Sequence, residues 1–300
     1  RYTQGLETHP GPCELDNEIN LFSVNPMFVK PHIVQMLTWK PHVLALQELR
    51  ADKMVQIEVE HIAKPCGFDC AWSNPTFSNT NRHCDEVGAA IVAHSDLKQT
   101  AIAAKSPEVT LLVESKRWVE RAYTAQNGML FFVTCVYGYS GAKKCPHLYK
   151  QNELLYQATV IHAATRGAHP YFICTDANVD PSDSLTMKMM VTSGKWSDLF
   201  APRERDSDDS TPPDPTHTYV KGGAIVDPQG APHARIETIF ANRYAMSLIK
   251  SCRFRWDLAL SDHVPLQVTL NVTTYKTIEM VLKPRAIFPI EPNQEHDFFF

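Results

Sequence analysis

Residues 260–270 read LSDHVPLQVTL, an Asp-His pair followed directly by alternating apolar and polar residues. The alternation predicts a half-buried β-strand whose buried face carries Val264, Leu266, Val268 and Leu270. Asp262 and His263 then lie at the start of this strand, where a carboxylate can bind a metal ion and an imidazole can transfer a proton. Because such a pair also arises by chance, its meaning depends on the polar residues at the ends of the other strands.

Size and composition narrow the classes of protein that need to be considered. With 300 residues, of which 44% are hydrophobic and 21% charged, the chain can bury a large core. The formal net charge of -4 argues against a strongly basic coat, so a polyanionic partner would be contacted by a local patch or through metal ions. No apolar run approaches the roughly 18 residues of a membrane span, and we expect no membrane partner. The eight cysteines are scattered, which favours a reduced intracellular compartment, nuclear or cytoplasmic.

The two ends of the chain differ from its middle. Residues 1–18 are polar and contain the breaker His-Pro-Gly-Pro, so we expect a leader or linker there. Residues 19–272 carry the periodic segments of one catalytic domain, and the pattern decays over residues 273–300, which we expect to be a tail or a linker to a following region. Since the chain begins with Arg1 rather than Met, we expect it to be one module of a larger, retroelement-like polyprotein.

Short strands interleaved with a few helices dominate the middle of the chain. Strands are predicted at 19–24, 43–46, 88–93, 110–113, 117–123, 129–136, 171–174, 233–241, 247–254 and 264–270, and helices between Pro31 and Pro41 and at 51–63, 146–165 and 184–191. The assignment at 51–63 is ambiguous, because Val55, Ile57 and Val59 also alternate as a strand would. The pattern predicts an α/β fold with two packed mixed β-sheets flanked by helices, a four-layer sandwich.

Four of the strand-like runs end in a polar side chain suited to catalysis. These residues are Asn25, Glu48, Tyr137 and Asp176. Ligand sites in sheet proteins gather at strand ends, where the core fixes a side chain and the loop exposes it. By the two-residue period of a strand, Asn178 shares a side with Asp176, and Arg235 shares one with Glu237. Together with the Asp-His pair, these residues would form one polar rim.

The residue types on this rim suit the hydrolysis of a phosphodiester. Oxygen ligands such as Glu48 and Asp262 suit Mg²⁺ or Mn²⁺ rather than zinc. A metal ion neutralises phosphate charge, an Asp can activate the attacking water, and amide or phenol groups can hold the other phosphate oxygens. A His oriented by a second carboxylate is kept in one tautomer and is more readily held as imidazolium.

Six short motifs occur in a characteristic order between about residues 19 and 272. They are SVN at 23–25, ALQELR at 45–50, VGAAI at 87–91, VYGY at 136–139, TDAN at 175–178 and SDH at 261–263. In this order they resemble the endonuclease/exonuclease/phosphatase superfamily, which includes abasic-site endonucleases, the deoxyribonuclease I type and the endonuclease domains of non-LTR retrotransposons. The resemblance implies a Mg²⁺-dependent endonuclease that cuts DNA, rather than RNA, to 3′-hydroxyl and 5′-phosphate ends. In a retroelement, such a nick would prime reverse transcription on the target DNA.

The resemblance also implies roles for individual residues. Glu48 and Asp262 would bind the metal, Asp176 would act on the attacking water, Tyr137 would support the transition state, and His263 would be the catalytic histidine. The candidate substrate-binding residues are Asn25, Asn178 and Arg235. Tyr139 competes with Tyr137 for the catalytic role. Cationic candidates for phosphate contacts, for which a solvated surface position is equally favoured, are Lys116, Arg117, Arg121, Lys143, Lys144 and Lys150.

Two departures from the family pattern leave other functions open. Glu237 stands where the family has the Asp that orients the catalytic histidine, so it must coil back or meet His263 at a different angle. Thr175 replaces a Gly and is expected to add bulk beside the phosphate. The alternatives are a phosphatase or phosphodiesterase of the same superfamily, acting on RNA, inositol phosphates or lipid head groups, and a catalytically impaired nucleic-acid-binding or interaction module.

Overall fold

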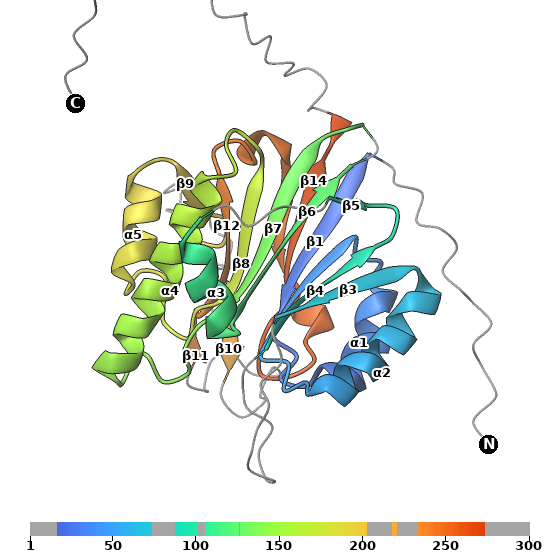
Figure 1. Cartoon of the computed structure of the whole chain (residues 1–300), viewed down its shortest axis with the longest axis horizontal. Coiled ribbons are helices and arrows are strands. Elements are labelled where there is room, and N and C mark those ends of the chain that lie inside the picture. Colours follow the sequence, from blue (N-terminus) through green and yellow to red (C-terminus); the bar gives the residue numbers. More distant parts are fainter. Residues whose placement is uncertain are drawn as a thin grey trace, which may run out of the picture.

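Two six-stranded mixed sheets pack face to face, and helices cover the outer side of each (Figure 1). The computed structural model describes residues 17–73, 88–100, 106–125, 127–202, 218–220 and 233–273. The strand orders are β13-β14-β1-β2-β4-β3 in one sheet and β5-β6-β7-β8-β12-β9 in the other. The predicted α/β sandwich is therefore confirmed. The predicted domain boundaries stay predictions, since most of the two end segments and the expected loop at 202–216 lie outside the described residues.

The first sheet is built around β1 and its neighbours. Its strands are β1 (Glu18–Val24), β2 (Val43–Gln47), β3 (Phe68–Trp72), β4 (Ala89–His94), β13 (Ile249–Phe254) and β14 (Leu266–Asn271). β1 pairs with β2 in parallel and with β14 in antiparallel orientation. The alternation that predicted β14 is confirmed, because Leu266, Val268 and Leu270 are fully buried and Val264 just before them is also buried.

The second sheet carries another parallel pair at its centre. Its strands are β5 (Lys98–Thr100), β6 (Trp118–Thr124), β7 (Leu130–Tyr137), β8 (Tyr171–Asp176), β9 (Trp196–Asp198) and β12 (Glu237–Asn242). β7 and β8 run in parallel, whereas β12 pairs with β8 in antiparallel register and places Glu237 opposite Asp176. A separate ribbon of β10 (Tyr219–Val220) and β11 (His233–Ala234) lies at one end of the sandwich (Figure 1).

Five α-helices of the described residues cover the two sheets from outside. They are α1 (Val29–Thr38) and α2 (Lys53–Ala63) on the first sheet, and α3 (Glu108–Ser115), α4 (Pro146–Ala164) and α5 (Leu185–Thr192) on the second (Figure 1). Three short 3₁₀ turns are η1 (Lys64–Cys66), η2 (Met246–Leu248) and η3 (Trp256–Leu258). None of the helices in the described ranges is long and apolar enough to cross a membrane.

Local chemistry explains why residues 53–63 form a helix rather than a strand. The Asp52 side chain accepts a hydrogen bond of 2.9 Å from the backbone N–H of Val55 and so caps the first turn. Val59 and Ala63, four residues apart, are fully buried on one helix face. The cap and the helical period together outweigh the strand-like alternation of the three β-branched residues.

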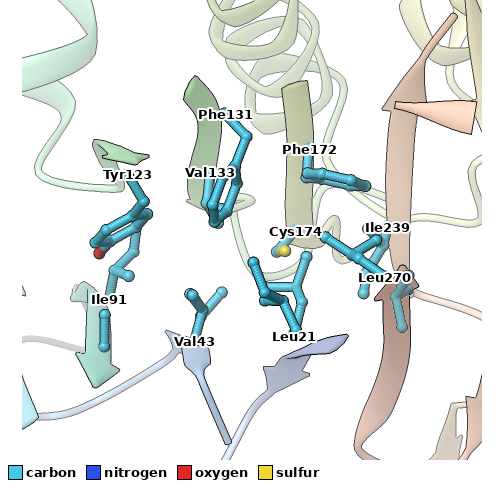
Figure 2. Packing of buried hydrophobic residues seen from close by; sticks show 14 of the residues in the cluster. Leu21, Val43, Ile91, Tyr123, Phe131, Val133, Phe172, Cys174, Ile239 and Leu270 are labelled. Atoms are coloured by element: carbon cyan, nitrogen blue, oxygen red, sulfur yellow. The ribbon is translucent and has the colours of Figure 1, made fainter. Parts of the chain in front are cut away.

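The main core fills the space between the two sheets. Figure 2 shows Leu21 and Val43 of the first sheet facing Val133 and Cys174 of the second, and all four side chains are fully buried. Close packing of this kind fixes the strand ends relative to one another. Trp196 is also buried, in a second cluster beneath α4.

Two sequence-based assignments were wrong, and four short strands of the described residues, β3, β5, β9 and β10, were not predicted. Residues 110–113, predicted as a strand, lie inside α3, because a short apolar run has no period of its own; Leu112 is buried while Leu111 is 45% exposed. The predicted strand at 233–241 is divided into β11 and β12 by residues 235–236. The sequence of β3, FDCAW, follows a helix closely and lacks an alternating pattern.

Candidate active site

The ends of two parallel strand pairs, one from each sheet, bring the predicted polar residues together. Asn25 follows β1 and Glu48 follows β2, while Tyr137 and Asp176 are the last residues of β7 and β8. Parallel neighbours end at the same edge of their sheet, and the packed core holds the two edges side by side. The prediction from strand ends is therefore confirmed for the placement of these four residues.

Asn25 lies at the centre of the cluster and contacts three of its members. Its Nδ2 donates to Oε2 of Glu48 at 2.9 Å and to Oδ2 of Asp176 at 2.8 Å, and lies 3.3 Å from Nε2 of His263. Its Oδ1 accepts a hydrogen bond of 2.9 Å from the backbone N–H of Met27. Because both ends of the amide are engaged and the side chain is buried, Asn25 has one orientation, which holds two carboxylates and an imidazole around one point.

Glu237 reaches the histidine despite its additional methylene. Its Oε1 is hydrogen-bonded to Nδ1 of His263, and both side chains are buried. Burial disfavours the charged imidazole, but the negative charge and hydrogen bond of Glu237 outweigh it and raise the pKa of His263 to about 9. On the other side of the ring, Oδ1 of Asp262 lies 3.6 Å from Nε2. The site therefore favours an imidazolium at neutral pH.

The carboxyl group of Asp176 is buried among other carboxylates, and both its burial and their charges disfavour its ionised form. Burial, followed by repulsion from Glu237, raises the pKa of Asp176 to about 7, although His263 and the Asn25 amide favour its charged form. Its Oδ1 accepts a hydrogen bond of 3.0 Å from the backbone N–H of Asn178. A carboxyl group with a pKa near 7 can accept and release a proton at neutral pH.

Tyr137, rather than Tyr139, carries the phenol that is buried in the site. Its hydroxyl is 2.7 Å from Oγ of Ser140, and burial, with the charges of Asp176 and Glu48, raises its pKa and keeps the phenol neutral. Arg117 lies over both rings, with Cζ at 4.9 Å from the Tyr137 centroid and 4.3 Å from that of Tyr139. Arg117 is buried and donates to the carbonyl of Gly138 at 2.7 Å, so it supports this loop and is not a surface phosphate contact.

The segments after β7 and β8 approach each other closely at Gly138. A Cβ at this position would lie 2.4 Å from the carbonyl oxygen of Ala177, so only glycine fits. Asn178 has a left-handed backbone with φ of 55°, and its Nδ2 donates to the carbonyl of Gly138 at 3.2 Å. The structure thus places Asn178 beside the cluster, with its backbone N–H on Asp176.

The contacts of Arg235 and Thr175 show where these two predicted residues lie relative to the cluster. The Arg235 guanidinium is ion-paired with Asp198 at 2.7 Å and Asp180 at 3.4 Å, so the structure does not bring it into the Asn25 cluster. The expectation that Thr175 adds bulk beside the phosphate was wrong. As a strand neighbour of Asp176, it points the other way, where its hydroxyl is hydrogen-bonded to that of Tyr156 on α4.

A three-residue segment that sequence reasoning did not single out joins the two halves of the site. Oγ1 of Thr218 accepts hydrogen bonds of 3.0 Å from the backbone N–H groups of both Ile236 and Glu237. The backbone N–H of Val264 donates to the carbonyl of Thr218 at 2.8 Å. The ring of Tyr219 lies against that of His263, with centroids 5.0 Å apart. Only a lone Thr-Tyr pair marks this segment in the sequence, so no periodic signal could have revealed it.

Replacement of Thr218 with valine should therefore disturb both stability and the site. The isosteric side chain leaves two buried N–H groups without an acceptor, and we expect a loss of roughly 2 to 5 kcal/mol in the free energy of unfolding. Urea denaturation measures this loss. Thr218→Ser keeps the hydroxyl and should lose less than half as much; an equal loss in both variants would show that the hydroxyl is not the source of the effect.

A divalent cation fits the groups of the cluster. Carboxylate oxygens of Glu48 and Asp176 and a ring nitrogen of His263 lie within 4.8 Å of one another. Because an imidazolium has no free lone pair, the carboxylates are the candidate ligands. Oδ1 of Asp262 and Oε2 of Glu237 are buried and have no hydrogen-bond partner among the described residues. Four carboxylates gather here against one imidazolium and the guanidinium of Arg50, so the charge is negative and oxygen ligands prevail, as Mg²⁺ or Mn²⁺ requires.

Comparison with solved structures identifies the fold. The chain superposes on the catalytic domain of Xenopus laevis APE2 with a TM-score of 0.63 at 14% identity, covering 84% of this chain and 92% of that one. It superposes on a 3′-5′ exonuclease, NExo, from Neisseria meningitidis with 0.61 at 16% identity, over 84% and 100%. The endonuclease domain of TRAS1, a telomere-specific non-LTR retrotransposon, gives 0.55 at 15% identity, over 84% and 98%.

These neighbours are members of the endonuclease/exonuclease/phosphatase superfamily, and the chain has their fold. The resemblance that the six motifs indicated is thus confirmed at the level of the fold. The sequence matches no protein-family model. None of the curated proteins matches it either.

Proposed function

We propose that the chain is a Mg²⁺-dependent endonuclease that hydrolyses DNA phosphodiester bonds and leaves 3′-hydroxyl and 5′-phosphate ends. The observation that carries the proposal is the hydrogen-bonding of Asn25 to Glu48 and Asp176 beside His263, which is itself bonded to Glu237. This cluster combines an acceptor for a water proton, a cationic donor for a phosphate oxygen and a negative pocket for a divalent ion. Structure neighbours that act on DNA support the choice of substrate; one was solved as a 3′ phosphatase with a product DNA hairpin.

Each residue has a distinct part in the proposed reaction. Asp176 takes the proton of the attacking water, because its raised pKa makes it a base suited to neutral pH. As the water oxygen bonds to phosphorus, the bond to the 3′-oxygen breaks, and the leaving oxygen takes a proton from solvent to become the 3′-hydroxyl. His263, held as imidazolium by Glu237, donates to a non-bridging phosphate oxygen, where negative charge grows in the transition state. Asn25 keeps both groups at the same point.

The remaining residues of the site would bind the metal ion or contact the phosphate. Glu48 and Asp262 would hold the cation, to which Asp176 and His263 lie adjacent. When bound, a divalent ion supplies charge neutralisation of the phosphate. Tyr137, whose raised pKa keeps its phenol neutral, donates a hydrogen bond to the phosphate, and Asn178 lines the same side through its contact with Gly138.

The biological setting is part of the same proposal. The likeness to the endonuclease domain of a non-LTR retrotransposon supports a chain that nicks target DNA within a larger polyprotein. We infer an intracellular location, nuclear or cytoplasmic; the proposed substrate and the free cysteines at 66, 70, 135, 145, 174 and 252 support it.

A supercoiled-plasmid nicking assay tests the activity. We expect nicking with Mg²⁺ and none with EDTA, and we expect Glu48→Gln to lower the rate by at least about 100-fold, because a neutral amide is a poor ligand for a hard cation. Glu58→Gln is the matched control, since Glu58 lies on the surface of α2 and pairs only with Lys30.

Other outcomes of this assay separate the alternatives. Binding of DNA without metal-dependent nicking would contradict the proposal and favour an impaired nucleic-acid-binding module. Hydrolysis of RNA, inositol phosphates or lipid head groups without nicking of DNA would instead favour a phosphatase or phosphodiesterase of the same fold.

A further inference from the structure

A large aromatic side chain lies exposed beside the buried polar cluster. Phe28 follows Asn25 by three residues and is 49% exposed, although its neighbour Val29 is fully buried. The backbone turns sharply here: Met27 has φ of 57°, and the N–H of Phe28 donates to the carbonyl of Pro26 at 2.6 Å. The turn carries the ring outward at the point where the chain leaves β1 for α1.

Arg50 connects this ring to the proposed metal ligand. Its Cζ lies 4.9 Å from the centroid of the Phe28 ring, and its Nη2 is 3.0 Å from Oε1 of Glu48. Its Nε is buried and has no hydrogen-bond partner in the part of the chain that the structure describes. The guanidinium therefore stacks on an aromatic ring, pairs with a carboxylate and still has one N–H to donate.

Backbone strain is concentrated at the same place. Seven non-glycine residues of the described chain have positive φ, and four of them are Met27, Glu48, Arg50 and Asn178. Such backbone conformations persist where the surrounding structure holds a side chain in one position.

We propose that Phe28, held by Arg50, contacts the flat face of a substrate nucleotide next to the scissile phosphate, and that this contact determines how tightly nucleic acid binds. The inference rests on the proposed function and adds a substrate-binding position to it. A flat hydrophobic ring suits a base or a sugar, and the cation behind it suits a strand of negative charge. Arg50 contacts both Phe28 and Glu48, so one connected set of side chains would hold the nucleotide and the phosphate.

The test separates binding from catalysis. We expect Phe28→Ala to raise KM for an oligonucleotide about tenfold with kcat unchanged, and to weaken binding of a labelled oligonucleotide in Ca²⁺ by the same factor. Phe28→Trp should restore both values. Val34→Ala is the matched control, because Val34 is 55% exposed on the same helix α1. Single-stranded and duplex substrates distinguish a base, which should be favoured in the single strand, from a sugar, which should serve in both.

The outcomes for the inference and for the proposed function are distinct. A cleaving wild type whose KM and binding are unchanged by Phe28→Ala would overturn the inference and leave the function standing. A wild type that binds but does not cleave, with binding weakened by Phe28→Ala, would overturn the function and support the contact. If the wild type neither binds nor cleaves DNA or RNA, both are overturned.

Discussion

His263→Ala is expected to lower the rate of plasmid nicking by about 10²- to 10³-fold, the range typical for the loss of one hydrogen-bond donor to a charged transition-state oxygen. Four groups act on this imidazole: Glu237 on Nδ1, Asn25 and Asp262 near Nε2, and the ring of Tyr219 against its face. A side chain so completely surrounded has one orientation, and its cationic form is favoured. Its removal takes away the donor aimed at the phosphate and also leaves Glu237 buried without a partner.

The loss must be distinguished from unfolding. Removing one partner of a buried charged pair destabilises a protein by about 3 to 5 kcal/mol, so circular dichroism and thermal unfolding should accompany the assay. His147→Ala is the matched control, since His147 is an exposed residue of α4 with no part in the proposed reaction. A folded His263→Ala protein that nicks at the rate of the wild type would contradict the assigned role.

Much of the fold could be predicted because its strands carry strong local patterns. The alternation that became β14 has the two-residue period of a strand, whereas the continuous apolar run that became β2 has no period and is assigned to a strand by its short length after Pro41. Residues 110–113 show where this fails: TLLV is equally consistent with either element, and its packing under Trp118 and α4 decides for a helix. Tertiary contacts of this kind are not visible in a local window of sequence.

The site was predictable to the extent that it lies at strand ends. Asn25, Glu48 and Asp176 each follow a buried run, and the parallel pairing of those strands brings them together. The ion pair between Arg235 and Asp198, by contrast, depends on the path of a loop, so it cannot be predicted from the spacing of residues in the sequence. The same applies to Thr218, whose hydrogen bonds join segments that are distant in sequence.

Glu237→Asp is expected to lower nicking by about 10- to 100-fold, because a shift of about 1 Å at a catalytic group can cost 100-fold in rate. The Glu237 backbone is fixed on both sides, by pairing opposite Asp176 and by the hydroxyl of Thr218. A shorter side chain on this fixed backbone would withdraw its carboxylate from Nδ1 of His263 by about one bond length. Glutamate is therefore the matched length on this backbone.

Glu237→Gln removes the negative charge of the side chain without changing its length, so it tests the effect of the charge alone. The amide keeps the size of the side chain but removes the negative charge that outweighs burial, so the pKa of His263 should fall and less of the imidazolium should be present at pH 7. We expect a rate at least about 100-fold below the wild type, recovering in part as the pH is lowered, because protonation of His263 then returns while Asp176, without the repulsion from Glu237, stays ionised to lower pH. A large rise in turnover for Glu237→Asp would reverse this reading: it would mean that the natural Glu holds His263 at an unfavourable angle and that the chain is an impaired enzyme.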